Sequence, residues 1–514
     1  MSASVALTFA GRTVPVELPR RGDPRLYVAG VTITLHVLGQ VALGFHVSIP
    51  QILSAILACA LVEAVVVWRR RRVLAWPSSA ILTGSGVALI LRDLGTSHGD
   101  WWSMRSWHLF AVVAVASLAT KYFVKIDGRQ VFNPSNVGLA LAFVLLGSSR
   151  VEPLDFYWGP LTPGLVAAYA AILVGGVAAT QKLGLLQMSA AFYAAFAAGN
   201  ALLAATGHCI TARWAFEPVC DGDYLRTVAT SPEVLVFMFF MITDPRVVPR
   251  GIVARVVFGA SVGAVAVLLM APQSTEFGAK VALLMSLVVC CALRRRLETL
   301  LPAPGSATDD LYVWARQALV GHRGASAVAA ASLAVLVPVA GIPSSDVPGT
   351  DVPVVARPSV RIAAAEIPPI SISRELRRLD PSFDEADARV LARDLLADLE
   401  LIERGLTHAD PSLLSSAAHG RALEVLRGKL GEVRRHGKTT WERYEIDELD
   451  AVITYPGGPQ SGARYGFVVR GRISSIEIGP AAGVTRVGSS QRGTRTFALV
   501  RSDRGEHLVA DFLG

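Results

Sequence analysis

Charge is scarce in this sequence. Only 18% of its 514 residues are Asp, Glu, Lys or Arg, whereas 52% are hydrophobic, and the mean hydropathy is +0.45. A soluble domain is typically about 25% charged. The shortage is uneven, because residues 26–342 hold long apolar runs while 343–514 are polar and rich in Pro, Arg and acidic residues. These features exclude an ordinary soluble protein and predict a polytopic membrane domain followed by a water-exposed domain.

Cysteine is also rare. The five cysteines form no CxxC or CxxCH motif, which argues against iron–sulfur, structural zinc and c-type haem sites. Cys209 and Cys220 fall in one predicted outer loop, where a disulfide and two free thiols remain alternatives. Residues 1–25 lack the basic-then-apolar order of a signal peptide. The net charge of +8 comes from basic residues beside apolar runs, so it predicts membrane topology and no nucleic-acid partner.

Ten apolar runs predict ten spans, and together they form the domain 26–296. Several of them are shorter than the ~20 residues of a straight span, as broken or re-entrant helices are. The runs are 26–46, 50–68, 77–92, 107–124, 134–149, 165–181, 185–205, 232–243, 252–271 and 277–293.

Basic residues precede the first run and follow every even-numbered run. By the positive-inside rule, the N-terminal segment 1–25 and the connector 297–323 are expected in the cytoplasm, in a bacterial plasma membrane. An eleventh apolar run, 324–343, predicts a span that carries the C-terminal region outside, with a surface helix or a linker as the alternative. The basic residues at the exits include Arg69–Arg72, Lys121, Lys125, Arg129, Lys182, Arg246, Arg250 and Arg294–Arg296.

The polar C-terminal region divides into a Pro-rich linker, 344–370, and a soluble α+β domain, 371–514. Helices are predicted over 372–435 from the spacing of Leu and Ala, and short strands over 438–511. Its histidines are scattered and form no catalytic constellation, so the domain is expected to be an interaction module.

Three stretches carry polar groups that are costly inside a membrane. They are "WPSSAILTGSGVALILRD" (76–93), "KIDGRQVFNPSNVGLALAFVLLG" (125–147) and "SPEVLVFMFFMITDPRVVP" (231–249). Asn133 is expected to cap the helix that begins at Pro134, and Pro245 disfavours helix at Asp244. The three stretches are therefore predicted to line a common cavity.

Pro77 and Pro232 each open a short apolar run that ends in polar residues. Five spans separate the two runs, so two related copies would have opposite orientations. The pattern predicts inverted five-helix repeats with a binding site between the halves, and coincidental similarity is the alternative.

Taken together, "LTGSGVALIL", "FNPSNVGLAL" and "FMFFMITDPRVVP" resemble the RnfD/NqrB-like family of membrane proteins, over about residues 76–300. Residues 199–300 are more similar to the UnbU-type relatives associated with enediyne biosynthesis. The family consists of flavin-carrying membrane components of ion-coupled redox complexes. The resemblance implies electron transport with FMN or riboflavin, together with other membrane redox subunits or a biosynthetic partner.

The family attaches FMN to a Thr in a Ser-Gly-Ala-Thr segment, which is missing here. The nearest stand-in is Thr162 in "WGPLTPG", with a plain turn hydroxyl as the alternative, so the flavin is expected to be non-covalent. Lys121 and Lys125 could bind its phosphate or snorkel to lipid headgroups. Residues expected to contact the flavin are Thr83, Ser85, Asn133, Asn136, Thr243 and Asp244.

Each of these side chains also has a purely structural interpretation. Thr83 and Ser85 can bond their own helix, Asn133 can only cap, and Asp244 can pair with Arg246 or Arg250. A second functional class therefore stays open: a flavin-free transporter or channel for a small or hydrophobic metabolite on the same scaffold.

Overall fold

The computed structural model describes residues 3–9, 12–20, 22–321, 352, 357–360, 362–456, 458, 460–481 and 483–513. The chain forms two compact units. The first comprises residues 1–210 and 219–346, and the second comprises 211–218 and 347–514. The predicted eleventh span, 324–343, lies outside the described residues.

Five helices of the first unit are long and apolar enough to cross a membrane. By length and composition, these helices agree with the predicted membrane domain. These helices are α2 (Ile49–Arg71), α6 (Pro163–Lys182), α7 (Leu186–Ala205), α10 (Ile252–Met270) and α11 (Glu276–Leu300). Large apolar side chains stay exposed on their outer faces, as expected where lipid is the solvent; examples are Leu57, Leu61 and Val174.

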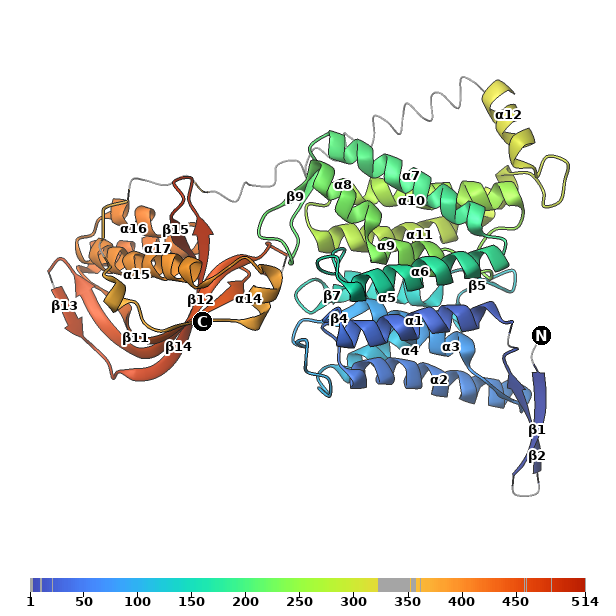
Figure 1. The fold of residues 1–514 in the computed structure, drawn as a ribbon, viewed down its shortest axis with the longest axis horizontal. Helices are drawn as coiled ribbons and strands as arrows, with labels where there is room; N and C mark the ends of the chain where they lie inside the picture. The colour runs from blue at the N-terminus through green and yellow to red at the C-terminus, as the bar shows by residue number, and fades with distance from the viewer. Residues whose placement is uncertain are drawn as a thin grey trace. The chain divides into compact units, whose positions relative to one another are not determined.

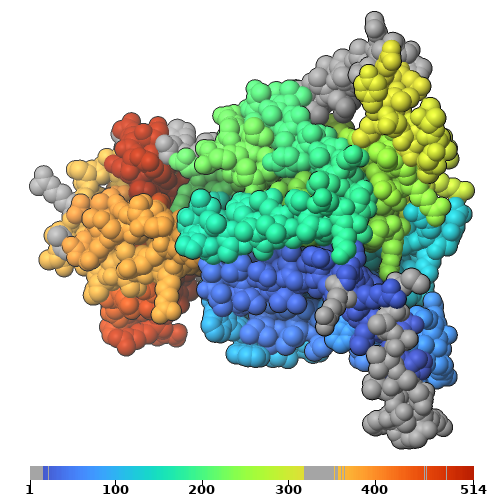
Figure 2. Space-filling model, turned by 45° about the vertical axis from the view of Figure 1, so that its right-hand side comes forward, coloured from blue at the N-terminus to red at the C-terminus, as the bar shows by residue number. Residues whose placement is uncertain are grey.

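The remaining predicted runs contain shorter or broken helices. They are α1 (Pro24–Val41), α3 (Ser78–Ile90), α4 (Trp107–Phe123), α5 (Pro134–Leu146) and α9 (Pro232–Val236), which continues as the π-helix η1 (Phe237–Met241). Figure 1 shows the helices of this unit running alongside one another, and Figure 2 shows α1, in blue, packed against α6, in teal.

Glycines let the short helices approach their neighbours closely. A Cβ on Gly84 of α3 would lie 2.5 Å from the Ala55 carbonyl oxygen of α2. A Cβ on Gly138 of α5 would lie 1.7 Å from Ser117 Oγ of α4. Small residues at such crossings allow helix packing in an apolar solvent, and here they fix α3 and α5 beside α2 and α4.

Short strands and helices connect the long elements. In the N-terminal segment, for which no secondary structure was predicted, β1 (Ala3–Phe9) and β2 (Arg12–Leu18) form a hairpin that β3 (Leu74–Ala75) extends. The other connecting elements are β4 (Leu91–Asp93) with β7 (Val151–Pro153), β5 (Lys125–Ile126) with β6 (Arg129–Gln130), β8 (Cys209–Ile210) with β9 (Val219–Cys220), α8 (Asp221–Thr230) and α12 (Leu311–Gly321).

The second unit is an α+β domain, as predicted. Its sheet has the order β10-β11-β12-β14-β15, with β13 paired to β12; β10 and β11 are parallel and the other pairs antiparallel. The elements are β10 (Ile370–Ile372), α14 (Arg374–Leu379), α15 (Glu385–Thr407), α16 (Pro411–Ala417), α17 (Gly420–His436), β11 (Thr439–Thr454), β12 (Arg464–Gly479), β13 (Gly483–Arg486), β14 (Gln491–Arg501) and β15 (His507–Leu513).

Two details of this unit differ from the prediction. The strands β11 and β12 have 16 residues each and pair along their length, so the prediction of only short strands was wrong. Part of the predicted linker also belongs to the unit, since Val352 bridges Ser502 and Arg357 contacts Asp398. The core is formed by the apolar faces of the sheet and of α15, α16 and α17.

Residues 211–218 belong to the second unit although they lie between α7 and α8 in the sequence. The amide of Ala463 donates to the Ala215 carbonyl at 2.9 Å, and the rings of Phe216 and Tyr465 stack with centroids 4.3 Å apart. A disulfide joins Cys209 to Cys220 on either side of this segment. Of the two alternatives left by the sequence, the structure has the disulfide.

Candidate functional site

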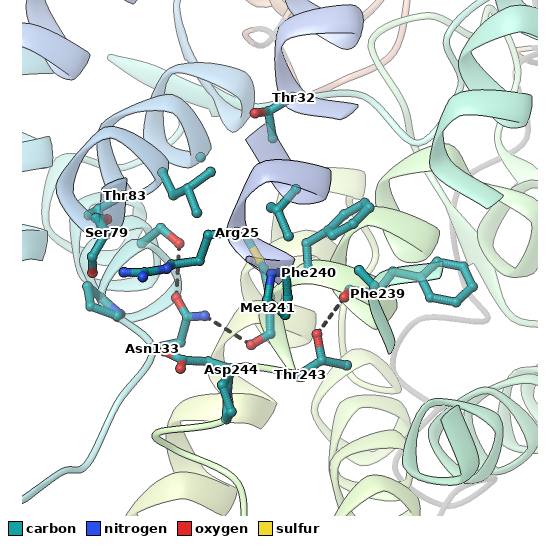
Figure 3. Close-up of a pocket in the computed structure, with 18 of the residues that line it drawn as sticks. Arg25, Thr32, Ser79, Thr83, Asn133, Phe239, Phe240, Met241, Thr243 and Asp244 are labelled. Atoms are coloured by element: carbon teal, nitrogen blue, oxygen red, sulfur yellow. Dashed lines mark hydrogen bonds between the residues drawn. The ribbon is translucent and has the colours of Figure 1, made fainter. Parts of the chain in front are cut away.

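The Asn-Pro motif organises the start of α5. Asn133 is the N-cap and Pro134 takes the first helical position, as the sequence predicts. The side-chain oxygen of Asn133 accepts hydrogen bonds from the Asn136 amide at 3.3 Å and from Ser135 Oγ at 2.9 Å. Its Nδ2 donates to the Met241 carbonyl at 3.0 Å, at the end of η1 (Figure 3). Asn133 therefore caps α5 and links it to the Thr-Asp-Pro stretch.

The Thr-Asp-Pro stretch ends a broken helix. η1 stops at Met241, and the chain leaves the helical path before Asp244, as Pro245 predicts. Thr243 Oγ1 donates to the Phe239 carbonyl at 2.5 Å. The Asp244 carboxylate accepts from the Arg246 amide at 3.0 Å and from Gln130 Nε2 at 3.4 Å. π-Helical turns are rare and are frequent at functional sites.

Arg294 fixes the loop that follows. Its side chain is buried, and its Nη1 donates to the Val247 carbonyl at 2.6 Å and to the Gln130 carbonyl at 3.3 Å. This one guanidinium from α11 joins the loop after Asp244 to the strand before Asn133. The two motifs are thus held together by several side-chain hydrogen bonds, including Asn133 to Met241 and Gln130 to Asp244.

The stretch 76–93 completes the wall of a cavity of about 280 Å³. Thr83 of α3 lines it and donates its hydroxyl to the Ser79 carbonyl at 3.0 Å. The walls are mainly apolar with a few polar groups, as in small-molecule sites, and the volume lies near the small end of the usual range. Lining residues include Thr32, Thr83, Asn133, Phe239, Phe240, Met241, Thr243 and Asp244 (Figure 3).

Charged side chains also line this cavity. Arg25 donates through Nε and Nη2 to the Asp23 carboxylate, with Nε–Oδ1 at 3.0 Å. Arg246 lies on another part of the wall and donates to Ser79 Oγ at 3.4 Å. Guanidinium groups in the wall of an apolar cavity can attract a phosphate or a carboxylate.

Four of the seven predicted site residues line the cavity, namely Thr83, Asn133, Thr243 and Asp244. Ser85 instead lies 3.1 Å, Oγ to Nε2, from His36 of α1. Asn136 donates to the Leu284 carbonyl of α11 at 2.9 Å. These two side chains join helices to one another.

Thr162 does not line the cavity. Its hydroxyl accepts from the Leu165 amide at 3.3 Å as the N-cap of α6. The cavity touches α6 at Ala179 and Leu183, about 25 Å farther along the helix at 1.5 Å per residue. The structure thus gives Thr162 a structural role, as a helix cap, where the alternative taken from the sequence was a plain turn hydroxyl.

The two lysines that could have bound a flavin phosphate lie away from the cavity. Lys121 contacts Glu63 at 2.7 Å and Ser79 Oγ at 3.1 Å, so it forms an ion pair inside the unit. Lys125 is exposed in β5. Neither residue lines the cavity.

Sequence reasoning missed several lining residues. Phe239, Phe240 and Arg246 lie within the third stretch, where their aromatic and cationic character was a usable signal. Asp23 is the N-cap of α1 and Arg25 lies in its first turn, and only the packing of α1 against α3 and α6 brings them to the wall.

The comparisons with known proteins do not identify a family, since no protein-family model matches the chain and no curated protein matches its sequence.

Proposed function

We propose that this chain is an integral membrane electron-transport protein that binds a flavin, FMN or riboflavin, non-covalently in the cavity. The observation that carries the proposal is the convergence of three sequence motifs on one cavity, through Thr83, Asn133 and Thr243. These motifs are also the ones that resemble the RnfD/NqrB-like family. A flavin would supply one- and two-electron transfer when bound.

The residues present suit a flavin ring better than a covalent FMN. Phe239 and Phe240 offer apolar surface for a planar ring, and the oxygens of Thr83 and Asp244 offer acceptors for its polar edge. Arg25 and Arg246 could pair with a phosphate. Thr162 caps a helix away from the cavity, so its hydroxyl is not placed to form a covalent bond with FMN in the cavity.

A single flavin needs partners to pass electrons on. Other membrane redox subunits or a biosynthetic partner would supply and accept them, and the UnbU-type resemblance favours a role in secondary-metabolite biosynthesis. The α+β domain would serve as the interaction module.

Ten spans in two inverted repeats form the topology that we infer for this function. The packing supports it: α2 packs on α4 and α4 on α5 in the first half, as α7 packs on α10 and α10 on α11 in the second. The N-terminus would be cytoplasmic. The disulfide and residues 211–218, which belong to the second unit, favour an outer position for the α+β domain. A cysteine that replaces the exposed Lys125 should not react with an impermeant thiol reagent in intact cells, because this loop is expected in the cytoplasm. Labelling of that cysteine would contradict the inferred topology.

A flavin-free transporter is the second candidate, and one observation favours it. The hydroxyls of Thr83 and Thr243 and the amide of Asn133 already donate to backbone carbonyls. The lining is therefore largely apolar in effect and could hold a hydrophobic metabolite.

Titration of the purified full-length protein with FMN and riboflavin separates the two candidates. Binding is read from the quenching of flavin fluorescence. Arg246→Gln should weaken FMN binding about 10- to 100-fold, since a charge-assisted hydrogen bond contributes roughly 1.5–3 kcal/mol, and should leave riboflavin binding nearly unchanged.

Arg150→Gln is the matched control, because Arg150 is exposed and does not line the cavity. It should change neither affinity. Absence of binding by both flavins to the wild-type protein would refute the flavin proposal and favour the transporter.

A further inference from the structure

A second group of buried polar side chains lies in the first unit, where β4 and β7 meet the starts of α9 and α11. Figure 1 shows β4 and β7 at the end of the helices opposite β5. We call it the buried charge cluster, and it consists of Arg92, Asp155, Glu233, Glu276 and Lys280. None of its members lines the cavity described above.

Lys280 is the centre of the cluster. Its ammonium group lies 2.9 Å from Glu276 Oε1 and 3.3 Å from Asp155 Oδ1, and it is also 3.4 Å from the Pro153 carbonyl. Glu276 accepts a further hydrogen bond from the Phe156 amide at 2.6 Å. Lys280 and Glu276 are buried, whereas the Asp155 side chain is 43% exposed. The ion pairs therefore lead from the interior to the surface.

Glu233 has no comparable partner. Its side chain is only 3% exposed, and its Oε2 atom has no hydrogen-bond partner in the structure as described. Arg92, which is 6% exposed, likewise has an Nη2 atom without a partner among the described residues. The Arg92 Nη1 atom donates to the Ala88 and Leu91 carbonyls. A buried carboxylate left without a partner is costly.

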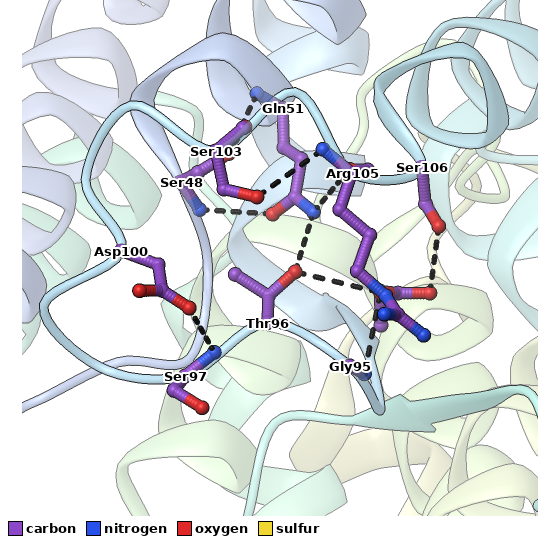
Figure 4. A network of polar contacts seen from close by, with 10 residues as sticks. Ser48, Gln51, Gly95, Thr96, Ser97, Asp100, Ser103, Arg105 and Ser106 are labelled. Carbon is purple, nitrogen blue, oxygen red and sulfur yellow. Dashed lines mark hydrogen bonds and ion pairs between the residues drawn. The ribbon is translucent and has the colours of Figure 1, made fainter.

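The neighbouring carboxylate Asp93 shows the contrast. It accepts from Arg105 Nε at 3.1 Å, from Ser106 Oγ at 2.9 Å and from the Gly95 amide at 3.3 Å (Figure 4). A cation and several hydrogen-bond donors compensate the negative charge of Asp93. The Oε2 atom of Glu233 has no such donor among the described residues.

The charge balance of the cluster points to a proton. The charged groups that act on Glu233 are Lys280, Glu276, Asp155 and Arg92. If all ionise, three carboxylates face two cations, which leaves an excess of one negative charge. Around the cluster, Glu152 lies opposite Arg92 across β4 and β7, and His36 lies within electrostatic range of Arg92. Of these two residues, an ionised Glu152 would add a negative charge and only a protonated His36 would add a positive one. With His36 neutral, the negative excess is therefore at least one.

A proton fits this excess better than a metal ion. No group of three His, Cys, Asp or Glu side chains with metal-binding geometry occurs in the described part of the chain. A proton on Glu233 removes one charge and supplies an O–H donor. Intramembrane carboxyl groups of this kind commonly mark proton pathways.

We propose that Glu233 is a proton-binding carboxyl group that exchanges its proton with water through Lys280 and Asp155. The Lys280 ammonium group first gives a proton to the Asp155 carboxylate, which lies 3.3 Å away. The neutral Lys280 amine then takes up the proton of Glu233 as the Glu233 O–H bond breaks, and Asp155 releases its proton to water. The cavity described above also comes close to the cluster. Its lining residue Val236 lies within one helical turn of Glu233, and its lining residue Ile90 lies two residues before Arg92. Glu233 thus stands between an exposed carboxylate and the cavity.

Infrared difference spectroscopy of the full-length protein in lipid vesicles tests this proposal. The wild-type minus Glu233→Gln spectrum at neutral pH should contain the carbonyl band of a protonated carboxylic acid. Glu63→Gln is the matched control and should leave that band unchanged, because Glu63 is paired with Lys121 at 2.7 Å. Glu233→Asp should move the band without removing it, which provides the test if the Gln variant does not fold.

The path is tested by transfer into D₂O. The wild-type band should shift as the proton exchanges, and Asp155→Asn should slow that shift at least tenfold while keeping the band. A difference spectrum without an acid band would overturn the protonation of Glu233. An exchange rate unaffected by Asp155→Asn would overturn the path. Neither outcome depends on a flavin.

Discussion

Replacement of Asn133 by alanine is expected to impair both the stability of the membrane unit and ligand binding. The change removes the cap of α5 and leaves the buried Met241 carbonyl without its donor. A lost cap costs about 1 kcal/mol and an unsatisfied buried group about 1–3 kcal/mol. The free energy of unfolding should therefore fall by about 2–4 kcal/mol, and affinity for FMN at least tenfold. Detergent-induced unfolding and fluorescence titration measure the two effects.

Two further variants separate the cap from the cavity. Asn133→Ser keeps an uncharged capping oxygen and removes the amide donor to Met241, so it should be more stable than Asn133→Ala. Asn136→Ala removes the bond to the Leu284 carbonyl, outside the cavity, and should lose stability while retaining flavin binding. Loss of flavin binding in Asn136→Ala but not in Asn133→Ala would contradict the assignment of the binding site to this cavity.

Replacement of Arg357 by alanine is expected to destabilise the α+β unit by about 3–5 kcal/mol. Arg357 Nη2 lies 2.9 Å from Asp398 Oδ1, an ion pair that is not aligned as a hydrogen bond, and donates to the Asp394 carbonyl. Both side chains of the pair are buried. Removal of one partner leaves an uncompensated buried charge. Pulse proteolysis of the full-length protein in urea, followed on the fragment 347–514, measures the change.

The loss should depend on pH. Burial raises the pKa of Asp398 well above its usual range, against the opposing effect of Arg357. In the variant, the folded unit would bind a proton that the unfolded chain releases, so lowering the pH should restore part of the stability. Arg389→Ala is the control, because its ion pair with Glu385 is exposed and contributes at most about 1 kcal/mol. Equal small losses in the two variants would contradict this explanation.

The sequence was sufficient to predict the convergence of the motifs because each carries a local backbone signal. Pro134 starts a helix and Pro245 ends one, and both effects act over a few residues. Polar groups at such helix breaks inside an apolar chain need hydrogen-bond partners, and here the polar groups of one break bond to those of another. The Asn133–Met241 bond is the direct example.

Side-chain direction explains why Ser85 does not line the cavity. Thr83 and Ser85 are two residues apart on one helix, so they point to different sides and cannot both face the cavity. Thr83 faces it, and Ser85 faces His36. Which of the two would point inward depends on the rotation of α3 against α2, which the close contact at Gly84 sets.

Contacts between distant segments explain the rest. Arg25 reaches the cavity from the first turn of α1, and the buried charge cluster joins residues from Arg92 to Lys280. No local pattern marks such pairs. Glu233 was within a quoted motif, but the lack of a hydrogen-bond partner for its Oε2 atom among the described residues became visible only when its neighbours were placed.

The absorbance spectrum of the protein purified from its own membrane, before and after acid precipitation, tests the central claim most directly. We expect a flavin spectrum in amounts comparable to the protein, with the colour released into the acid supernatant because no covalent bond holds it. A colourless preparation that also fails to take up added flavin would contradict the claim, and colour retained in the pellet would contradict non-covalent binding.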